Sequence, residues 1–116
     1  PDYMEKVAHF ASFCDYLILD SILPGLTSIG VAGVPHDWSM DKKIVDSFPN
    51  LKVILAGGLG PDNVGKAIEE VRPYGVDSFT KTSFKDEKGL RGKDPEKIRL
   101  FVQRAQEAFR KNAIKE

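Results

Sequence analysis

Two short apolar runs of the sequence are each followed by residues that could take part in a reaction or bind a ligand. The run from residue 16 to 19 is followed by Asp20, whose carboxyl group is either a candidate acid or the start of a turn. The run from residue 52 to 56 is followed by Gly57 and Gly58, just before a predicted helix. Glycine N–H groups can approach a phosphate closely, and a helix N-terminus favours an anion. The same glycines could instead form a tight turn that binds nothing.

Other reactive side chains have simpler interpretations. Cys14 falls on the apolar face of a predicted helix, which favours a small core residue over a nucleophile. His36 and Asp37 could be taken for a catalytic dyad, but adjacent residues at a helix start are more often a cap and its neighbour. A lone cysteine forms no internal disulfide, and no Cys or His spacing is typical of a metal site. We therefore expect neither a metal nor a cofactor.

Helices are predicted wherever apolar residues recur at steps of three and four. The first helix spans residues 2–14, and the second begins near Asp37 or Ser39, either of which could cap it. Gly60-Pro61 opens the third helix, and Asp94 caps the fourth. The apolar stripes expected to face the core in the last three helices are Met40, Ile44, Val45 and Phe48; Val64, Ala67, Ile68 and Val71; and Ile98, Phe101, Val102, Ala105 and Phe109.

Strands are predicted between these helices. The runs at 16–19 and 52–56 are too short for helices and do not alternate, which is typical of buried parallel strands. A third strand from Gly75 to about Thr80 is weaker, because few of its residues are apolar. The segments 21–36 and 81–93 contain glycines and no clear period, and both are predicted to be loops.

Composition excludes several classes of partner. The 116 residues carry 17 basic and 17 acidic side chains, and this balance gives no reason to expect a nucleic acid or an anionic membrane as partner. No apolar run approaches the ~20 residues of a membrane span, and no signal peptide is recognisable. We therefore expect a cytoplasmic protein.

The alternation of helices and strands predicts an α/β fold with three parallel strands and four helices. Three strands leave both sheet edges open, whereas a (β/α)₈ TIM barrel closes its sheet with about 250 residues. The chain length suits about three-eighths of such a barrel. We therefore expect residues 1–116 to form a single domain, the C-terminal portion of a partial (β/α)₈ TIM barrel.

The order of motifs resembles that of the phosphoribosylanthranilate isomerase family. The resemblance covers nearly the whole chain, from the fifth helix of the barrel to the eighth. It is carried by Asp15-Tyr16-Leu17-Ile18-Leu19-Asp20-Ser21, by Gly30-Val31-Ala32-Gly33 before His36-Asp37-Trp38-Ser39, by Leu55-Ala56-Gly57-Gly58-Leu59-Gly60-Pro61-Asp62-Asn63-Val64, by Tyr74-Gly75-Val76-Asp77 and by Lys93-Asp94-Pro95.

The resemblance implies an Amadori rearrangement of a phosphorylated ribosylamine in tryptophan biosynthesis. An aspartate acid opens the sugar ring and a cysteine base removes the neighbouring proton. Asp20 matches the acid, whereas the base belongs to the first strand of the barrel, which has no counterpart here. Gly57 and Gly58 match the phosphate turn. Gly30 and Gly33 match two glycines of a substrate loop.

The segment after the third strand departs most from the family pattern. Asp77 and Thr80 align with an aspartate and a serine of the family, and we count both as candidate substrate-binding residues. Lys81 stands where the family has glycine, so its side chain either binds phosphate as a point charge or occupies the space that phosphate needs. The run from residue 84 to 91 aligns with nothing in the family.

Three functions follow as expectations. The first is a phosphosugar isomerase resembling phosphoribosylanthranilate isomerase, inactive as this chain alone because the base is missing. The second is a paralogous phosphate-binding TIM barrel that catalyses a different reaction. The third is a non-catalytic partial barrel, whose open edges pair with a second copy or with the N-terminal half of a barrel.

Overall fold

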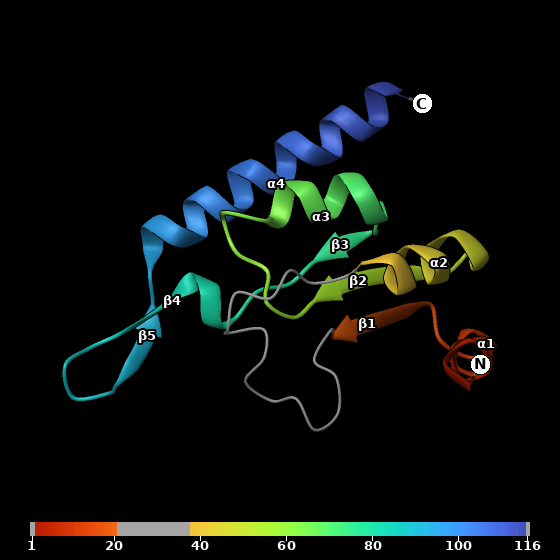
Figure 1. Cartoon of the computed structure of the whole chain (residues 1–116), viewed down its shortest axis with the longest axis horizontal. Helices are drawn as coiled ribbons and strands as arrows, with labels where there is room; N and C mark the ends of the chain where they lie inside the picture. The colour runs from red at the N-terminus through yellow and green to blue at the C-terminus, as the bar shows by residue number, and fades with distance from the viewer. Residues whose placement is uncertain (1, 21–37, 116) are drawn as a thin grey trace.

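The computed structural model describes residues 2–20 and 38–115 and contains a parallel sheet flanked by helices (Figure 1). The elements in chain order are α1 (Asp2–Ala11), β1 (Tyr16–Asp20), α2 (Ser39–Ser47), β2 (Lys52–Ala56), α3 (Val64–Val71), β3 (Gly75–Val76), the 3₁₀ helix η2 (Thr80–Thr82), β4 (Ser83–Lys85), β5 (Arg91–Lys93) and α4 (Pro95–Lys115). The predicted α/β alternation of three parallel strands and four helices is confirmed.

The sheet has the order β1-β2-β3, and both pairings are parallel. Alternate residues of a strand point to opposite faces. Leu17 and Leu19 of β1 pack with Val53 of β2 against α1 and α2. Ile18, on the other face of β1, is 60% exposed. The helices therefore cover one face of the sheet, and among the described residues the opposite face of β1 stays open.

The larger core lies between β2, α3 and α4. Leu55 and Ile68 are fully buried there with the rest of the α3 stripe, which confirms that predicted stripe. On α4, Phe101 and Ala105 are buried as predicted, but Ile98 and Val102 are 38% and 44% exposed. The expectation for these two residues was wrong because α4 contacts mainly the narrow α3, which covers less than the whole apolar stripe.

The helix α2 differs from the prediction in two ways. Met40 is 42% exposed, whereas Ile44 of the same stripe is buried. Ser39 is the first helical residue rather than the cap, since the N-cap is Trp38, whose side chain makes no cap hydrogen bond. The Trp38 ring is buried and joins the larger core, and it packs at the start of the helix as the sequence indicates. The other proposed cap, Asp37, lies outside the described residues.

The remaining helix ends are set by local hydrogen bonds. Asp94 Oδ1 accepts from the Glu96 and Lys97 N–H groups at 3.0 and 3.2 Å, which confirms the predicted N-cap of α4. Helix α3 ends at Val71, and its C-cap Arg72 has a left-handed conformation with φ 58°. It begins at Val64 rather than at Pro61, because residues 61–63 form a turn first. None of the helices in the described part of the chain is long and apolar enough to cross a membrane.

Two predictions after β2 need correction. Strand β3 has only two residues and does not extend to Thr80, since its partner β2 ends and the chain turns into η2. The segment 81–93 is not simply a loop, because β4 and β5 pair antiparallel and form a hairpin that projects from the body (Figure 1). Its turn is built by Asp86, whose Oδ1 accepts from the Lys88 and Leu90 N–H groups at 2.9 and 2.8 Å, and by Gly89 at φ 84°.

Candidate functional site

The candidate site is the edge of the sheet where its strands end. Asp20, the last residue of β1, pairs in register with Ala56, the last residue of β2. The Asp77 N–H donates to Leu55 O at 2.9 Å, which places the end of β3 beside the same edge. The three arrowheads in Figure 1 point the same way. Carboxyl ends of parallel strands are where α/β barrels place their catalytic groups.

Asp20 has an exposed side chain and belongs to the face of β1 turned away from the helices. Asp20 lies two residues after Ile18 in the strand, so the two side chains point to the same face. An accessible carboxyl group at a strand end can donate a proton to a ligand that lies over the sheet edge. The structure thus places Asp20 at the carboxyl end of β1, on the exposed face of the strand.

The turn after β2 depends on its two glycines. Gly57 and Gly58 have φ angles of 95° and 69°, a region that residues with a Cβ rarely adopt. A Cβ at Gly58 would meet nothing within 4 Å, so the backbone conformation and not lack of space requires glycine there. Within the described chain the N–H groups of both glycines take part in no hydrogen bond, which leaves two donors at the strand end for an anion.

Asn63 completes this turn, and its role was not predicted. Its Oδ1 accepts from the Gly60 N–H at 2.8 Å, and its Nδ2 donates to Gly58 O at 3.0 Å. One amide side chain thus fixes two peptide groups of the turn, and it takes up the Gly60 N–H that an anion could otherwise use. The signal was present, since asparagine after glycine and proline at a helix start commonly bonds to nearby backbone.

The segment after β3 packs directly onto this turn. Ser78 Oγ donates to Leu59 O at 2.7 Å. A Cβ built on Gly60 would lie 2.6 Å from the Cβ of Lys81, so the two backbones approach closely. The Lys81 side chain itself is exposed. The structure thus brings Lys81 close to Gly60 in the turn that follows β2.

The other predicted substrate residues vary in placement. Asp77 and Thr80 are exposed near the same edge, Asp77 just after β3 and Thr80 at the start of η2. Gly30 and Gly33 lie outside the described residues. Throughout residues 2–20 and 38–115, no three His, Cys, Asp or Glu side chains are grouped so that they could hold a metal ion.

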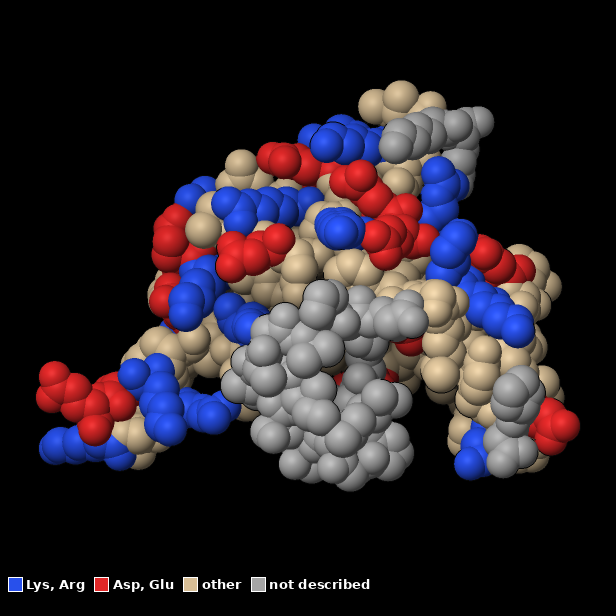
Figure 2. All heavy atoms as spheres, in the orientation of Figure 1, with Lys and Arg blue, Asp and Glu red and all other residues tan. Residues whose placement is uncertain are grey.

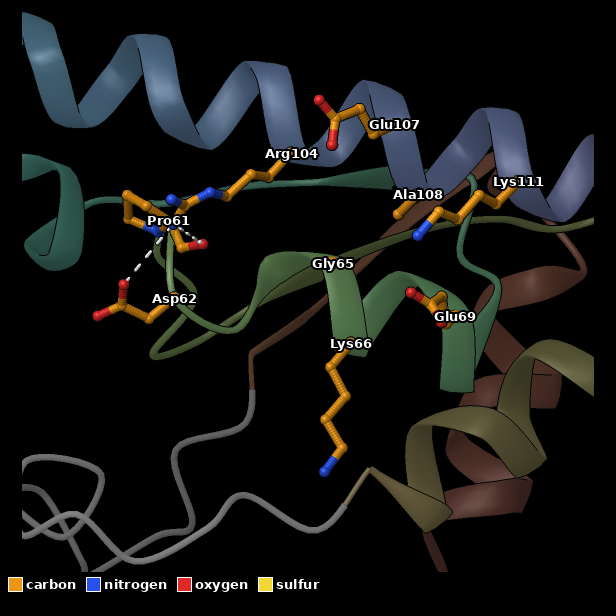
Figure 3. A pocket seen from close by; sticks show the side chains of 9 residues that line it. All are labelled: Pro61, Asp62, Gly65, Lys66, Glu69, Arg104, Glu107, Ala108 and Lys111. Atoms are coloured by element: carbon orange, nitrogen blue, oxygen red, sulfur yellow. Dashed lines mark hydrogen bonds and ion pairs between the residues drawn. The ribbon is translucent and has the colours of Figure 1, made fainter.

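A separate pocket lies on the outer side, between α3 and α4. It has a volume of about 250 Å³ and a charged lining that includes Lys66, Glu69 and Lys111 (Figure 3). Arg104 reaches across it from α4, donating to Pro61 O at 2.9 Å. Charges of both signs alternate over this surface (Figure 2). The lining carries charges of both signs, and it is formed by α3, α4 and the turn at Pro61 and Asp62 rather than by the ends of the strands.

Comparison with known proteins gives consistent results. The sequence model of a family described as N-(5'-phosphoribosyl)anthranilate (PRA) isomerase matches residues 2–104. N-(5'-phosphoribosyl)anthranilate isomerase 2 of Methanosarcina mazei is 42% identical over 94% of this chain and 46% of its own length. The isomerase of Desulforudis audaxviator is 43% identical over 91% of this chain and 46% of its own.

A solved structure shows the same fold. The N-(5'-phosphoribosyl)anthranilate isomerase of Pyrococcus furiosus superposes with a TM-score of 0.51, at 21% identity, over 90% of this chain and 57% of its own. The chain spans about half the length of the curated relatives it matches. With the strand order, the parallel pairing and the family match over most of its residues, this chain belongs to the N-(5'-phosphoribosyl)anthranilate isomerase family.

Proposed function

We propose that this chain supplies the acid and the phosphate site of a phosphoribosylanthranilate isomerase that acts in tryptophan biosynthesis. The observation that carries the proposal is the shared strand edge, where Asp20 pairs with Ala56 and the donors of Gly57 and Gly58 follow directly. A carboxylic acid beside an anion site suits a reaction on a phosphorylated sugar. The proposed ligand is the phosphoribosyl substrate, with no metal or cofactor and in a reducing cytoplasm.

In this proposal Asp20 donates its proton to the ring oxygen of the ribosylamine. The bond from that oxygen to the anomeric carbon breaks, and the nitrogen lone pair forms a C=N bond in its place. A base then removes the proton from the neighbouring carbon, and the resulting enol relaxes to the ketone. We propose that this base comes from another part of the barrel, as the family resemblance implies.

The decisive test replaces Asp20 in the full-length gene product. Asp20→Asn keeps the shape and removes the proton donor, so we expect kcat to fall by about 10²–10⁴-fold while phosphate binding persists. Asp62→Asn is the matched control, since Asp62 is an exposed carboxylate on the outer side near Arg104. Unchanged turnover of phosphoribosylanthranilate by Asp20→Asn would reject Asp20 as the acid.

A second candidate is a phosphate-binding paralogue with a different reaction. Lys81 in place of the family glycine favours it, because Lys81 packs against Gly60 of the proposed phosphate turn, and the β4–β5 hairpin begins two residues later. A panel of aromatic and aliphatic phosphosugars separates the two candidates. Preference for an unrelated phosphate ester would replace the isomerase by this second candidate.

We further propose that the remaining strands of a barrel cover the open face of β1. Ile18 is 60% exposed there, and the relatives have about as much chain again beyond the matched part. The test is co-purification with a tagged polypeptide covering the unmatched part of the Methanosarcina mazei relative. Ile18→Lys should abolish capture, whereas Ile114→Lys on α4, where Ile114 is 79% exposed, should not. A dimer of this chain alone in light scattering would favour a second copy as the occupant.

A further inference from the structure

The carbonyl oxygen of Phe79 collects hydrogen bonds from three side chains. Ser83 Oγ donates to it at 2.6 Å, Lys93 Nζ at 3.0 Å and Thr82 Oγ1 at 3.3 Å. The Lys93 ammonium also lies 4.7 Å from the centre of the Phe79 ring. The Phe79 carbonyl group thus helps to tie the segment between β3 and β4 to the hairpin.

Further contacts connect Lys93 to the glycine turn. Lys93 Nζ donates to Thr82 Oγ1 at 3.2 Å, and Ser78 Oγ lies 3.3 Å from that hydroxyl group. Ser78 Oγ in turn donates to Leu59 O, directly after the glycines. Thr82 is 3% exposed, so its hydroxyl group is held inside this network rather than in water.

The hairpin brings Lys93 to this position. In the β4–β5 register Lys93 is the partner of Ser83, and the following Asp94 N–H donates to Thr82 O at 3.0 Å. Lys97 Nζ adds a bond to Ser83 O at 3.2 Å. The pairing of β4 with β5 therefore places the Lys93 ammonium group next to η2.

We propose that Lys93 is a positioning residue for the phosphate site. It holds residues 79–82 in the conformation that presses Lys81 against Gly60 and so fixes the glycine turn that would bind the phosphate. This inference rests on the proposed phosphate site and assigns to the hairpin the task of shaping it. Lys93 acts through Thr82 and Ser78, not by touching the ligand.

The experiment follows the amide resonances of Gly57 and Gly58 in the full-length gene product during titration with inorganic phosphate. Lys93→Met should raise the dissociation constant roughly three- to tenfold, the scale of one hydrogen bond in a network. Lys88→Met, a loss of the same charge at the hairpin turn, should leave it unchanged. Equal effects of the two variants would overturn the inference.

A charge-neutral variant separates positioning from simple attraction. Thr82→Val removes the shared hydroxyl group and keeps every charge, so its effect on the dissociation constant should match that of Lys93→Met, and the double variant should add little. Full additivity would mean that Lys93 acts as an independent cation and would overturn the inference.

A readout without ligand tests positioning even if phosphate does not bind. In that case the proposed function fails, and amide exchange decides the role of Lys93. Lys93→Met should accelerate exchange of the Thr82 N–H, which donates to Phe79 O at 3.4 Å, and Lys88→Met should not. Unchanged exchange in Lys93→Met would show that the contact positions nothing.

Discussion

Gly60 packs against the Cβ of Lys81, although the two residues belong to different connections of the sheet. A Cβ on Gly60 would stand 2.6 Å from the Lys81 Cβ, a separation that real side chains do not tolerate. The glycine at position 60 is thus required by a neighbour and not by its own φ, in contrast to Gly57 and Gly58. This contact joins the two segments that carry the candidate phosphate ligands.

Gly60→Ala should therefore destabilise the protein by about 1–3 kcal/mol, because one of the two backbones must move. Gly65→Ala is the matched control. Gly65 lies in helix α3 with nothing within 4 Å of its would-be Cβ, so alanine should stabilise by about 0.5–1 kcal/mol. Urea unfolding of both variants measures the difference, and equal stability of the two would contradict the contact.

Asn63 should matter for binding more than for folding. Asn63→Asp keeps the acceptor for the Gly60 N–H, removes the donor to Gly58 O and adds a negative charge near the proposed anion site. We expect at least tenfold weaker binding of inorganic phosphate, from the lost bond and the added repulsion together. Calorimetric titration measures it, with Asp62→Asn as the control. Retained phosphate affinity in Asn63→Asp would mean that the turn does not need the hydrogen bond from Asn63 Nδ2 to Gly58 O.

Substitutions of Lys81 can show whether its side chain binds the phosphate or blocks the position of the phosphate. If its ammonium binds phosphate, Lys81→Gln should weaken binding and flatten its dependence on salt, because one screened charge is gone. If the side chain fills the phosphate position, Lys81→Gly should strengthen binding. Lys66→Gln, on the outer face of α3, is the control for net charge. Titrations at two salt concentrations decide between these outcomes.

The first turn of α4 should make stability depend on pH. The hydrogen bond from Arg99, with its charge, lowers the pKa of Glu96 below the ordinary 4.5. A lowered pKa in the folded state means that the pair stabilises fully above that ordinary value, and that the contribution is lost as the pH falls through the lowered pKa. Glu96→Gln should reduce the fall of the urea unfolding midpoint at acid pH, between about pH 5 and pH 2. Glu70→Gln, an exposed carboxyl change on α3, should alter it less.

The sequence predicted the parts of the fold that depend on apolar patterning. The α3 stripe around Ile68 and the buried β2 around Leu55 are confirmed because these residues have no alternative to burial. The Asp94 cap was likewise readable, since it depends only on neighbours in the chain. Ile98 was misjudged because its exposure depends on how much of α4 the narrow α3 covers.

The sequence predicted that Asp20 and the glycine turn follow the ends of strands, but it did not predict the hydrogen bonds around them. The order of elements placed Asp20 and the glycine turn at one edge, since parallel strands end together. The hairpin was missed because its strands are short and polar and gain their pairing from the turn at Asp86. The bond from Lys93 Nζ to Phe79 O joins residues 14 positions apart across the hairpin, which no local pattern reveals.

The position of β2 between two parallel neighbours also bears on folding kinetics. Its pairings with β1 and β3 join segments far apart in the chain, so each requires closure of a long intervening stretch before any ladder bond forms. The sheet should consequently assemble late, after the local helices. Once formed, the central amides of β2 are shielded on both sides, and they should report the slowest opening of the whole molecule.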